Sequence, residues 1–209
     1  MLRFAYLFRD RLLSGPRLMS LMILTGLLAA GCGLSSIPKA KNEVEATFAE
    51  VQNQYKRRAD LIPNLVQVVK GYAAHEQETL TAVVEARNKA AQTGVDPAKL
   101  DASALAEYQK AQGSLGAALG RLMVVVERYP DLKADRNFRD LQAQLEGTEN
   151  RITIARQRHI EAIKEFNDLI TSPPTSWTNS WFLHHKKMPQ WSVGDEERQQ
   201  NEKPPQVGF

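Results

Sequence analysis

The sequence predicts an all-α protein: an antiparallel up-and-down four-helix bundle of long helices, with an N-terminal membrane-attachment segment and an irregular C-terminal tail. Between residues 37 and 170, apolar residues recur at intervals of three and four with charges between them, and no stretch alternates like a half-buried strand. Consecutive long helices joined by short connections pack antiparallel. We therefore expect a signal peptide or anchor at 1–31, the bundle at 32–170 and the tail at 171–209.

The first 31 residues have the pattern of an export signal. They hold four of the 27 basic residues and one of the 24 acidic ones, so the other 178 residues carry 23 of each and the net charge of +3 is N-terminal. The apolar run at 18–30 has thirteen residues. A membrane-spanning helix needs about 20, whereas a secretory signal needs roughly 7–15 behind a positive segment.

The lone cysteine, Cys32, lies where this run ends. The sequence 28–32 resembles a bacterial lipobox, in which the thiol accepts a diacylglycerol and becomes the mature N-terminus, so we predict lipidation at Cys32. The alternative is an uncleaved helical anchor with an incidental cysteine. Because Gly33, rather than Asp, follows the cysteine, the resemblance favours the outer membrane, facing the periplasm, in a cell with two membranes. One cysteine excludes an internal disulfide framework.

The first apolar stripe of the bundle runs over residues 44–72 and is interrupted at Arg58. Asp60 is a candidate N-cap, and Pro63 would then lie in a first turn, where its missing N–H costs little. We favour a helix break at 58–60. A single long helix kinked at Pro63 is the alternative, because the spacing runs through the interruption unchanged.

Three more helices follow. The second carries its apolar stripe to Gln92 and stops at the loop 93–97, the third runs from about Asp101 until Pro130 ends it, and the fourth has about 35 residues. Each glycine in a helix interior costs about 1 kcal/mol relative to alanine, so glycines there indicate close backbone contact with a neighbour or local flexibility. The third helix has three of them: Gly113, Gly116 and Gly120.

The tail differs in composition from the bundle. Its 39 residues hold five of the ten prolines and all three tryptophans. A patch formed by Trp177, Trp181 and Phe182 would suit docking or a membrane interface, since aromatic side chains favour both. We favour the simpler expectation that the tail folds back on the bundle.

The motifs of common enzymes and metal sites are not found. His75 begins an H-E-x-x-H-like run, but Thr79 stands in place of the second imidazole. Arg156 stands where the Glu-x-x-His of a di-iron bundle would need its glutamate before His159. We expect His159 to be a hydrogen-bonded core residue, and we predict no catalytic residues, no cofactor and no metal. With Asp60 close after a short basic cluster at 56–58, nucleic-acid binding is not expected either.

Three blocks of the chain resemble the LemA family of bacterial envelope proteins. They are residues 55–76, residues 129–138 and residues 145–152, and the C-terminal Pro-Gln-Val-Gly-Phe is similar as well. The resemblance implies a membrane attachment followed by an extracytoplasmic four-helix bundle, with no established enzymatic activity. The family usually begins with a transmembrane helix and continues after the bundle with a Phe-Pro and a Phe-Gly-containing stretch. Ser172-Pro173-Pro174 stands there in this chain.

Polar residues of the bundle are the candidate sites. We favour a structural role for them, in helix capping and interhelical hydrogen bonds, over the alternative of a shared recognition surface. They are Arg57, Arg58, Asp60, Asn64, Asn88, Glu149, Asn150 and Arg151. The predicted function is a membrane-attached extracytoplasmic scaffold or adaptor without catalysis, held to the membrane by lipid on Cys32 or by an N-terminal helix, with envelope proteins as partners. The alternative is a small-ligand or peptide sensor with a pocket between helices.

Overall fold

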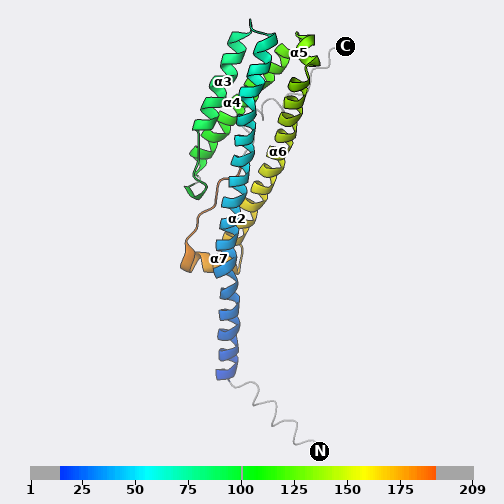
Figure 1. The fold of residues 1–209 in the computed structure, drawn as a ribbon. Coiled ribbons are helices and arrows are strands. Elements are labelled where there is room, and N and C mark those ends of the chain that lie inside the picture. The colour runs from blue at the N-terminus through cyan, green and yellow to red at the C-terminus, as the bar shows by residue number, and fades with distance from the viewer. Residues whose placement is uncertain (1–14, 100, 192–209) are drawn as a thin grey trace, which may run out of the picture. The chain divides into compact units, whose positions relative to one another are not determined.

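The structure, a computed structural model, describes residues 15–99 and 101–191, and their side chains from Leu34 onward apart from Lys99. Every regular element there is a helix, as predicted, and none of these residues forms a strand. In chain order the elements are α2 (Gly15–Tyr72), α3 (Gln77–Gln92), the 3-10 turn η1 (Pro97–Lys99), α4 (Ala102–Val126), α5 (Pro130–Ala134), α6 (Arg136–Thr171), α7 (Thr175–Thr178) and the π-helical turn η2 (Asn179–Leu183) (Figure 1).

The chain divides into two compact units, and α2 and α6 each contribute to both. The first unit comprises residues 1–42 and 164–187, and the second comprises residues 43–163 and 188–209. No helix among the described residues has an apolar stretch long enough to cross a membrane.

The predicted break near Asp60 is wrong. α2 continues through residues 58–60 to Tyr72 as one helix, so Asp60 lies in the helix interior and caps nothing. The physical reason is the unbroken spacing of the buried face: Tyr55, Ile62 and Leu65 are all buried, and a break would have removed part of that face from the core.

Pro63 is tolerated inside α2 because another helix supplies the missing donor. A proline in a helix interior leaves the carbonyl four residues earlier, here that of Ala59, without its N–H partner. Arg87 of α3 donates from Nε to the Ala59 carbonyl oxygen over 3.2 Å. The side chain of Ala59 is buried, so an unpaired carbonyl at this place would cost free energy.

The predicted third and fourth helices form with nearly the expected bounds. Asp101 is the N-cap of α4, and its Oδ1 accepts from the backbone N–H of Ala104 at 2.7 Å. This hydrogen bond, and a second one from the Ser103 hydroxyl, lower the pKa of the Asp101 carboxyl. α4 ends at Val126, earlier than predicted, and Pro130 instead occupies the first turn of α5.

The second unit contains two clusters of buried side chains. One joins apolar residues of α2, α3, α4, α5 and α6 around Leu65, Val83 and Leu122. The other is aromatic, and its members are Phe48, Val51, Tyr55, Leu105, Tyr108, Ile152, Ala155 and Trp191. Figure 1 shows α3 and α4 lying side by side in this unit.

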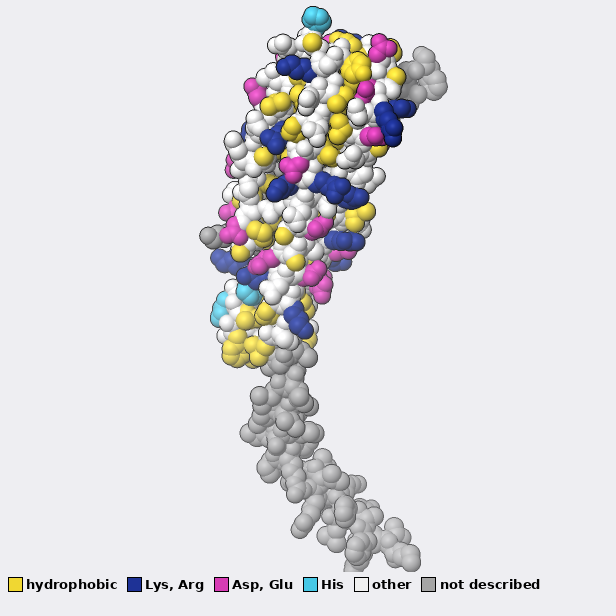
Figure 2. All heavy atoms as spheres, in the orientation of Figure 1, with side chains coloured by type: hydrophobic (Ala, Val, Ile, Leu, Met, Phe, Trp, Pro, Cys, Tyr) yellow, Lys and Arg dark blue, Asp and Glu magenta, His cyan; other side chains and the backbone are white. Residues whose placement is uncertain are grey.

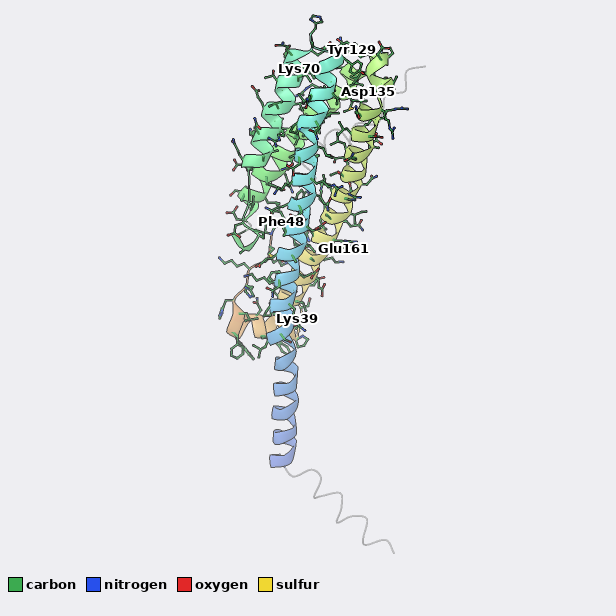
Figure 3. All side chains as sticks on the ribbon, viewed as in Figure 1. Lys39, Phe48, Lys70, Tyr129, Asp135 and Glu161 are labelled. Atoms are coloured by element: carbon green, nitrogen blue, oxygen red, sulfur yellow. The ribbon has the colours of Figure 1, made fainter. Side chains whose placement is uncertain are left out.

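Polar contacts close one end of the second unit, where Figure 3 labels Lys70, Tyr129 and Asp135. Tyr72, the last residue of α2, donates from its hydroxyl to Asp135 Oδ2 at 3.0 Å. Tyr129 donates to Glu76 Oε1 at 3.1 Å. The first contact joins the end of α2 to Asp135, which directly follows α5. The second joins Glu76, in the connection between α2 and α3, to Tyr129, which directly precedes α5.

Candidate functional site

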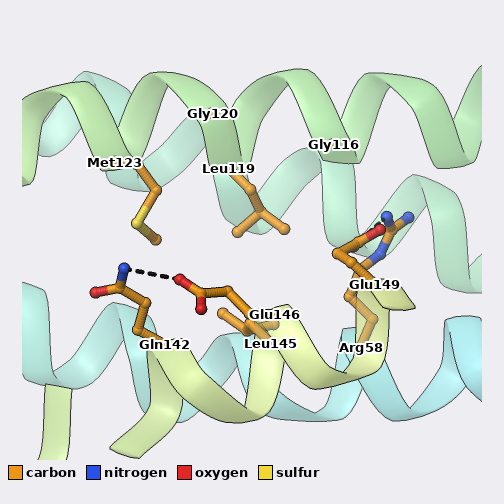
Figure 4. A pocket seen from close by; sticks show the side chains of 9 residues that line it. All are labelled: Arg58, Gly116, Leu119, Gly120, Met123, Gln142, Leu145, Glu146 and Glu149. Carbon is orange, nitrogen blue, oxygen red and sulfur yellow. Dashed lines mark hydrogen bonds and ion pairs between the residues drawn. The ribbon is translucent and has the colours of Figure 1, made fainter. Parts of the chain in front are cut away.

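A pocket of about 330 Å³ lies in the second unit between α4 and α6, with Arg58 of α2 at one end (Figure 4). Leu119 and Met123 of α4 and Leu145 of α6 give it apolar walls. Its polar lining comes from Arg58, Gln142, Glu146 and Glu149. The size is near the lower end of the range for small-molecule sites, which are mostly apolar with a few polar groups.

Two glycines of α4 leave the space that forms this pocket. Gly116 and Gly120 line it, and a Cβ atom added at either would meet no heavy atom within 4 Å. Gly113 is equally open. The expectation that these glycines allow close backbone contact with a neighbouring helix is therefore wrong.

Arg58 is the one residue of the eight predicted polar residues whose side chain is buried. Its side chain is 4% exposed and connects three helices. Nη1 donates to Glu149 Oε1 at 2.9 Å, and Nη2 donates to the side-chain and backbone oxygens of Gln112 at 2.8 and 3.1 Å. The guanidinium also lies 4.9 Å from the centre of the Tyr55 ring. Its Nε is buried with no hydrogen-bond partner among the described residues.

The other predicted polar residues lie at the surface, and apart from Glu149 the structure does not bring them into one cluster with Arg58. Arg57, Asp60 and Asn64 are exposed on α2 at spacings of three and four, so they share one face of that helix. Asn150 and Arg151 are exposed on α6. Apart from Arg58 and Glu149, Asn88 is the one predicted polar residue with a described side-chain hydrogen bond. Its Oδ1 accepts from Arg87 Nη1 at 3.3 Å.

His159 is a core residue, as expected. It is fully buried, 5.2 Å from the Phe48 ring and 6.4 Å from the Trp191 ring between centroids. Its Nδ1 lies 3.2 Å from the Thr47 hydroxyl. Burial lowers the pKa of His159 to about 4, and a hydrogen bond to the backbone of Val44 opposes part of that shift. The ring is therefore neutral at pH 7.

The tail is divided between burial and exposure. Trp191 folds into the aromatic cluster, edge-on to Tyr108 at 6.5 Å and with Arg156 4.9 Å from its ring centre. Trp177, Trp181 and Phe182 instead remain exposed on α7 and η2, in the first unit.

The predicted lipidation site, Cys32, lies outside the residues whose side chains the structure describes. Among the side chains that are described, no group of three or more His, Cys, Asp or Glu residues has the arrangement of a metal site.

A family model, described as the LemA family, matches residues 47–209. The chain belongs to the LemA family. The match covers the second unit almost completely and continues through the tail to Phe209. It includes Arg58, Glu149 and every residue that lines the pocket.

The curated proteins that this LemA chain matches share about a quarter of their residues with it over the aligned region. The magnetosome proteins MamQ 1 and MamQ 2 of Paramagnetospirillum magneticum are 26% identical to it over 154 residues, which is 65% of this chain and 56% of each relative. Protein LemA of Metamycoplasma hominis is 24% identical over 148 residues, 69% of this chain and 61% of that protein. The chain thus spans a little more than half the length of the curated relatives it matches.

Sequence reasoning missed two polar partners that this LemA chain uses. Gln112 was read only as one position of a helix, although it accepts two hydrogen bonds from the guanidinium of Arg58. Arg87 was not selected either, although a proline inside a continuous helix requires a donor for the carbonyl it frees. That requirement signals that some side chain must donate to the Ala59 carbonyl but does not single out Arg87, and nothing in the spacing distinguishes Gln112 from other polar residues of α4.

Proposed function

We propose that this LemA family protein is a membrane-attached adaptor of the bacterial envelope, working through protein contacts and without catalysis. The observation that carries the proposal is the exposed polar face of α2. Arg57, Asp60 and Asn64 belong to the run through which the chain resembles its family, yet they are solvent-exposed and lie away from the buried clusters. A solvated helix face needs only polar side chains of some kind, so the particular side chains at these positions are available for recognition.

The proposal includes an antiparallel up-and-down arrangement of the four long helical segments of the second unit. Contacts that join different helices support it. Arg58 of α2 contacts α4 through Gln112 and α6 through Glu149, while Arg87 of α3 contacts α2. These contacts hold the helices against one another at defined positions, which would present the exposed face in one geometry.

Attachment is proposed through lipid on Cys32, with an outer-membrane, periplasm-facing location in a cell with two membranes. The support is the lipobox-like sequence that ends at Cys32 and the excess of arginine before it. Intact-mass analysis of the membrane fraction tests this step. We expect a mature chain that begins at a lipid-modified Cys32, and a chain that keeps an unmodified Met1 would overturn it.

Site-specific photo-crosslinking in growing cells tests the contacts. A photoreactive residue at Asn64 reports on the exposed polar face of α2, and one at Glu107, exposed on α4, serves as the matched control. We expect a discrete crosslinked protein at position 64 that is weak or missing at position 107. Equal patterns at the two positions would contradict a recognition role for this face.

A second candidate function is favoured by the pocket between α4 and α6: a sensor for a small, largely apolar ligand. The pocket has apolar walls. The buried Nε–H of Arg58, which also lines the pocket, has no hydrogen-bond acceptor among the described residues. A polarity-sensitive naphthalene dye tests it. We expect the dye to bind the wild type and the variant Gly113→Phe but not Gly120→Phe, which fills the pocket. Equal binding to both variants would exclude this pocket as the site.

A further inference from the structure

The first unit ends in an aromatic surface that packing does not use. Trp177 is 56% exposed, Trp181 71% and Phe182 65%, and all three lie within six residues of one another on α7 and η2. Leu34 of α2, in the same unit, is 52% exposed. Figure 2 shows hydrophobic side chains gathered over α7 and η2. We refer to Trp177, Trp181 and Phe182 together as the aromatic turn.

Specific contacts hold the aromatic turn in place. The Asn179 side chain donates to the backbone oxygen of His185 at 3.0 Å and accepts from its N–H at 2.9 Å. His184 adopts a left-handed conformation, with φ of 54°, and donates from its N–H to the Asn179 carbonyl at 2.7 Å. Thr175 donates from its hydroxyl to the Leu169 carbonyl of α6. The chain therefore orders this turn while leaving its largest apolar side chains in water.

The unit that carries the aromatic turn has a net positive charge among its described residues. The described residues of the first unit, 34–42 and 164–187, include five lysines and two acidic residues, Glu165 and Asp168. Lys186 and Lys187 directly follow the turn and are exposed. The unit thus combines exposed indoles with a net positive charge. Tryptophan favours the membrane–water interface, and lysine favours anionic headgroups.

The position of this unit along the chain fits the same surface. Ten residues of continuous helix separate Cys32 from Asn42, the last residue of α2 in the unit, which is a length of about 15 Å. A lipid on Cys32 would therefore hold the whole compact unit within reach of the headgroup region. Apolar surface and a positive charge at that distance from a lipid anchor match a bilayer better than they match a soluble partner.

We propose that the aromatic turn inserts into the interfacial region of the membrane that carries the protein, with Lys186 and Lys187 contacting anionic lipid headgroups. The proposal rests on the proposed attachment at Cys32 and deepens it. The diacylglycerol predicted on Cys32 has two acyl chains, which already anchor a protein stably, so a second contact serves to restrict how the protein can tilt on the membrane. The aromatic turn supplies that second contact.

Tryptophan quenching tests the proposal on the full-length, membrane-extracted protein reconstituted into phosphatidylethanolamine–phosphatidylglycerol vesicles. Vesicles with bromine on the acyl chains quench only tryptophans near the hydrocarbon. We expect brominated lipid to lower the emission by roughly half, because two of the three tryptophans lie in the turn. The double variant Trp177→Phe, Trp181→Phe should lose this quenching, since Trp191 is buried in the second unit. Quenching that persists in the variant would overturn the proposal.

Flotation of the same vesicles separates the two claims. Protein that floats but is not quenched overturns the aromatic turn's insertion and leaves the attachment intact, whereas protein that does not float overturns both. A photoreactive residue at Phe182 adds an independent result: crosslinks to lipid support insertion, and crosslinks to a protein overturn it. The double variant Lys186→Gln, Lys187→Gln should reduce the dependence of quenching on phosphatidylglycerol, and an unchanged dependence would overturn the headgroup contact.

Discussion

Arg87 Nε donates a 3.2 Å hydrogen bond to the carbonyl oxygen of Ala59, the acceptor that Pro63 leaves without a donor in its own helix. α2 therefore remains continuous through a proline because a side chain of α3 replaces one backbone hydrogen bond. The contact also fixes α3 against α2 at one defined position. Three residues that are unremarkable one by one thus account for the course of the longest helix.

The first prediction is a coupling between Arg87 and Pro63. Arg87→Met should lower the free energy of unfolding by about 1–3 kcal/mol, since it leaves the Ala59 carbonyl unpaired. In the background Pro63→Ala, which restores a backbone N–H, the same change should cost about 1 kcal/mol less. Denaturant titration of the four proteins measures the coupling, with the exposed Arg121→Met as a control. Additive effects would show that Arg87 does not replace the missing donor.

The second prediction concerns the buried guanidinium of Arg58. Arg58→Met should destabilise the protein by about 2–4 kcal/mol, because it removes donors shared with Gln112 and Glu149 and leaves buried acceptors unpaired. Glu149→Gln should cost less than about 1 kcal/mol, since this carboxylate is half exposed and an amide oxygen still accepts. Thermal unfolding ranks the two. Equal losses would mean that the ion pair, rather than the buried network, stabilises this site.

The third prediction is a pH dependence carried by His159. Its pKa is about 4 in the folded protein and 6.5 as the ordinary value, so the unfolded chain binds the proton first. Stability is then fully present above pH 6.5 and falls as the pH drops toward 4, by up to about 3 kcal/mol. His159→Phe should flatten the unfolding free energy over that range. The exposed control His184→Gln should not, and a wild-type-like slope in His159→Phe would contradict the assignment.

The fourth prediction is that α4 tolerates larger residues at its glycines. Gly113→Ala, Gly116→Ala and Gly120→Ala each place a Cβ in open space, so each should raise the free energy of unfolding by up to about 1 kcal/mol. Calorimetry measures the shift in Tm. A lower Tm in any of the three would mean that the neighbouring helix approaches α4 more closely than the structure has it.

Periodicity alone predicted most of the helical architecture. The spacing of apolar residues at intervals of three and four predicted α3, α4 and α6, because an amphipathic stripe appears directly in the order of residues. The break at Asp60 was wrong since a local rule about proline and N-caps was set against a longer pattern, and the donor that resolved the conflict, Arg87, is distant in sequence. Interhelical hydrogen bonds of this kind have no signature along the chain.

The candidate site was predicted only in part. Arg58 and Glu149 were selected, and they do meet, but the reason was a family resemblance rather than their pairing. The pocket follows from glycines whose open surroundings depend on how α4 and α6 are spaced, a property of packing that the sequence does not display. Trp177 and Trp191 were treated as one tail, whereas one is exposed and the other is buried. Composition cannot separate them.

The most direct test of the adaptor account compares stability with partner capture in Asp60→Ala, using the crosslinker at Asn64. Asp60 is exposed inside a continuous helix, so the account predicts an unchanged Tm within about 2 °C and a clear loss of the crosslinked protein. Asn150→Ala on α6 provides a second exposed position for comparison. A lower Tm with undiminished crosslinking would mean that these polar residues support the fold and do not bind a partner.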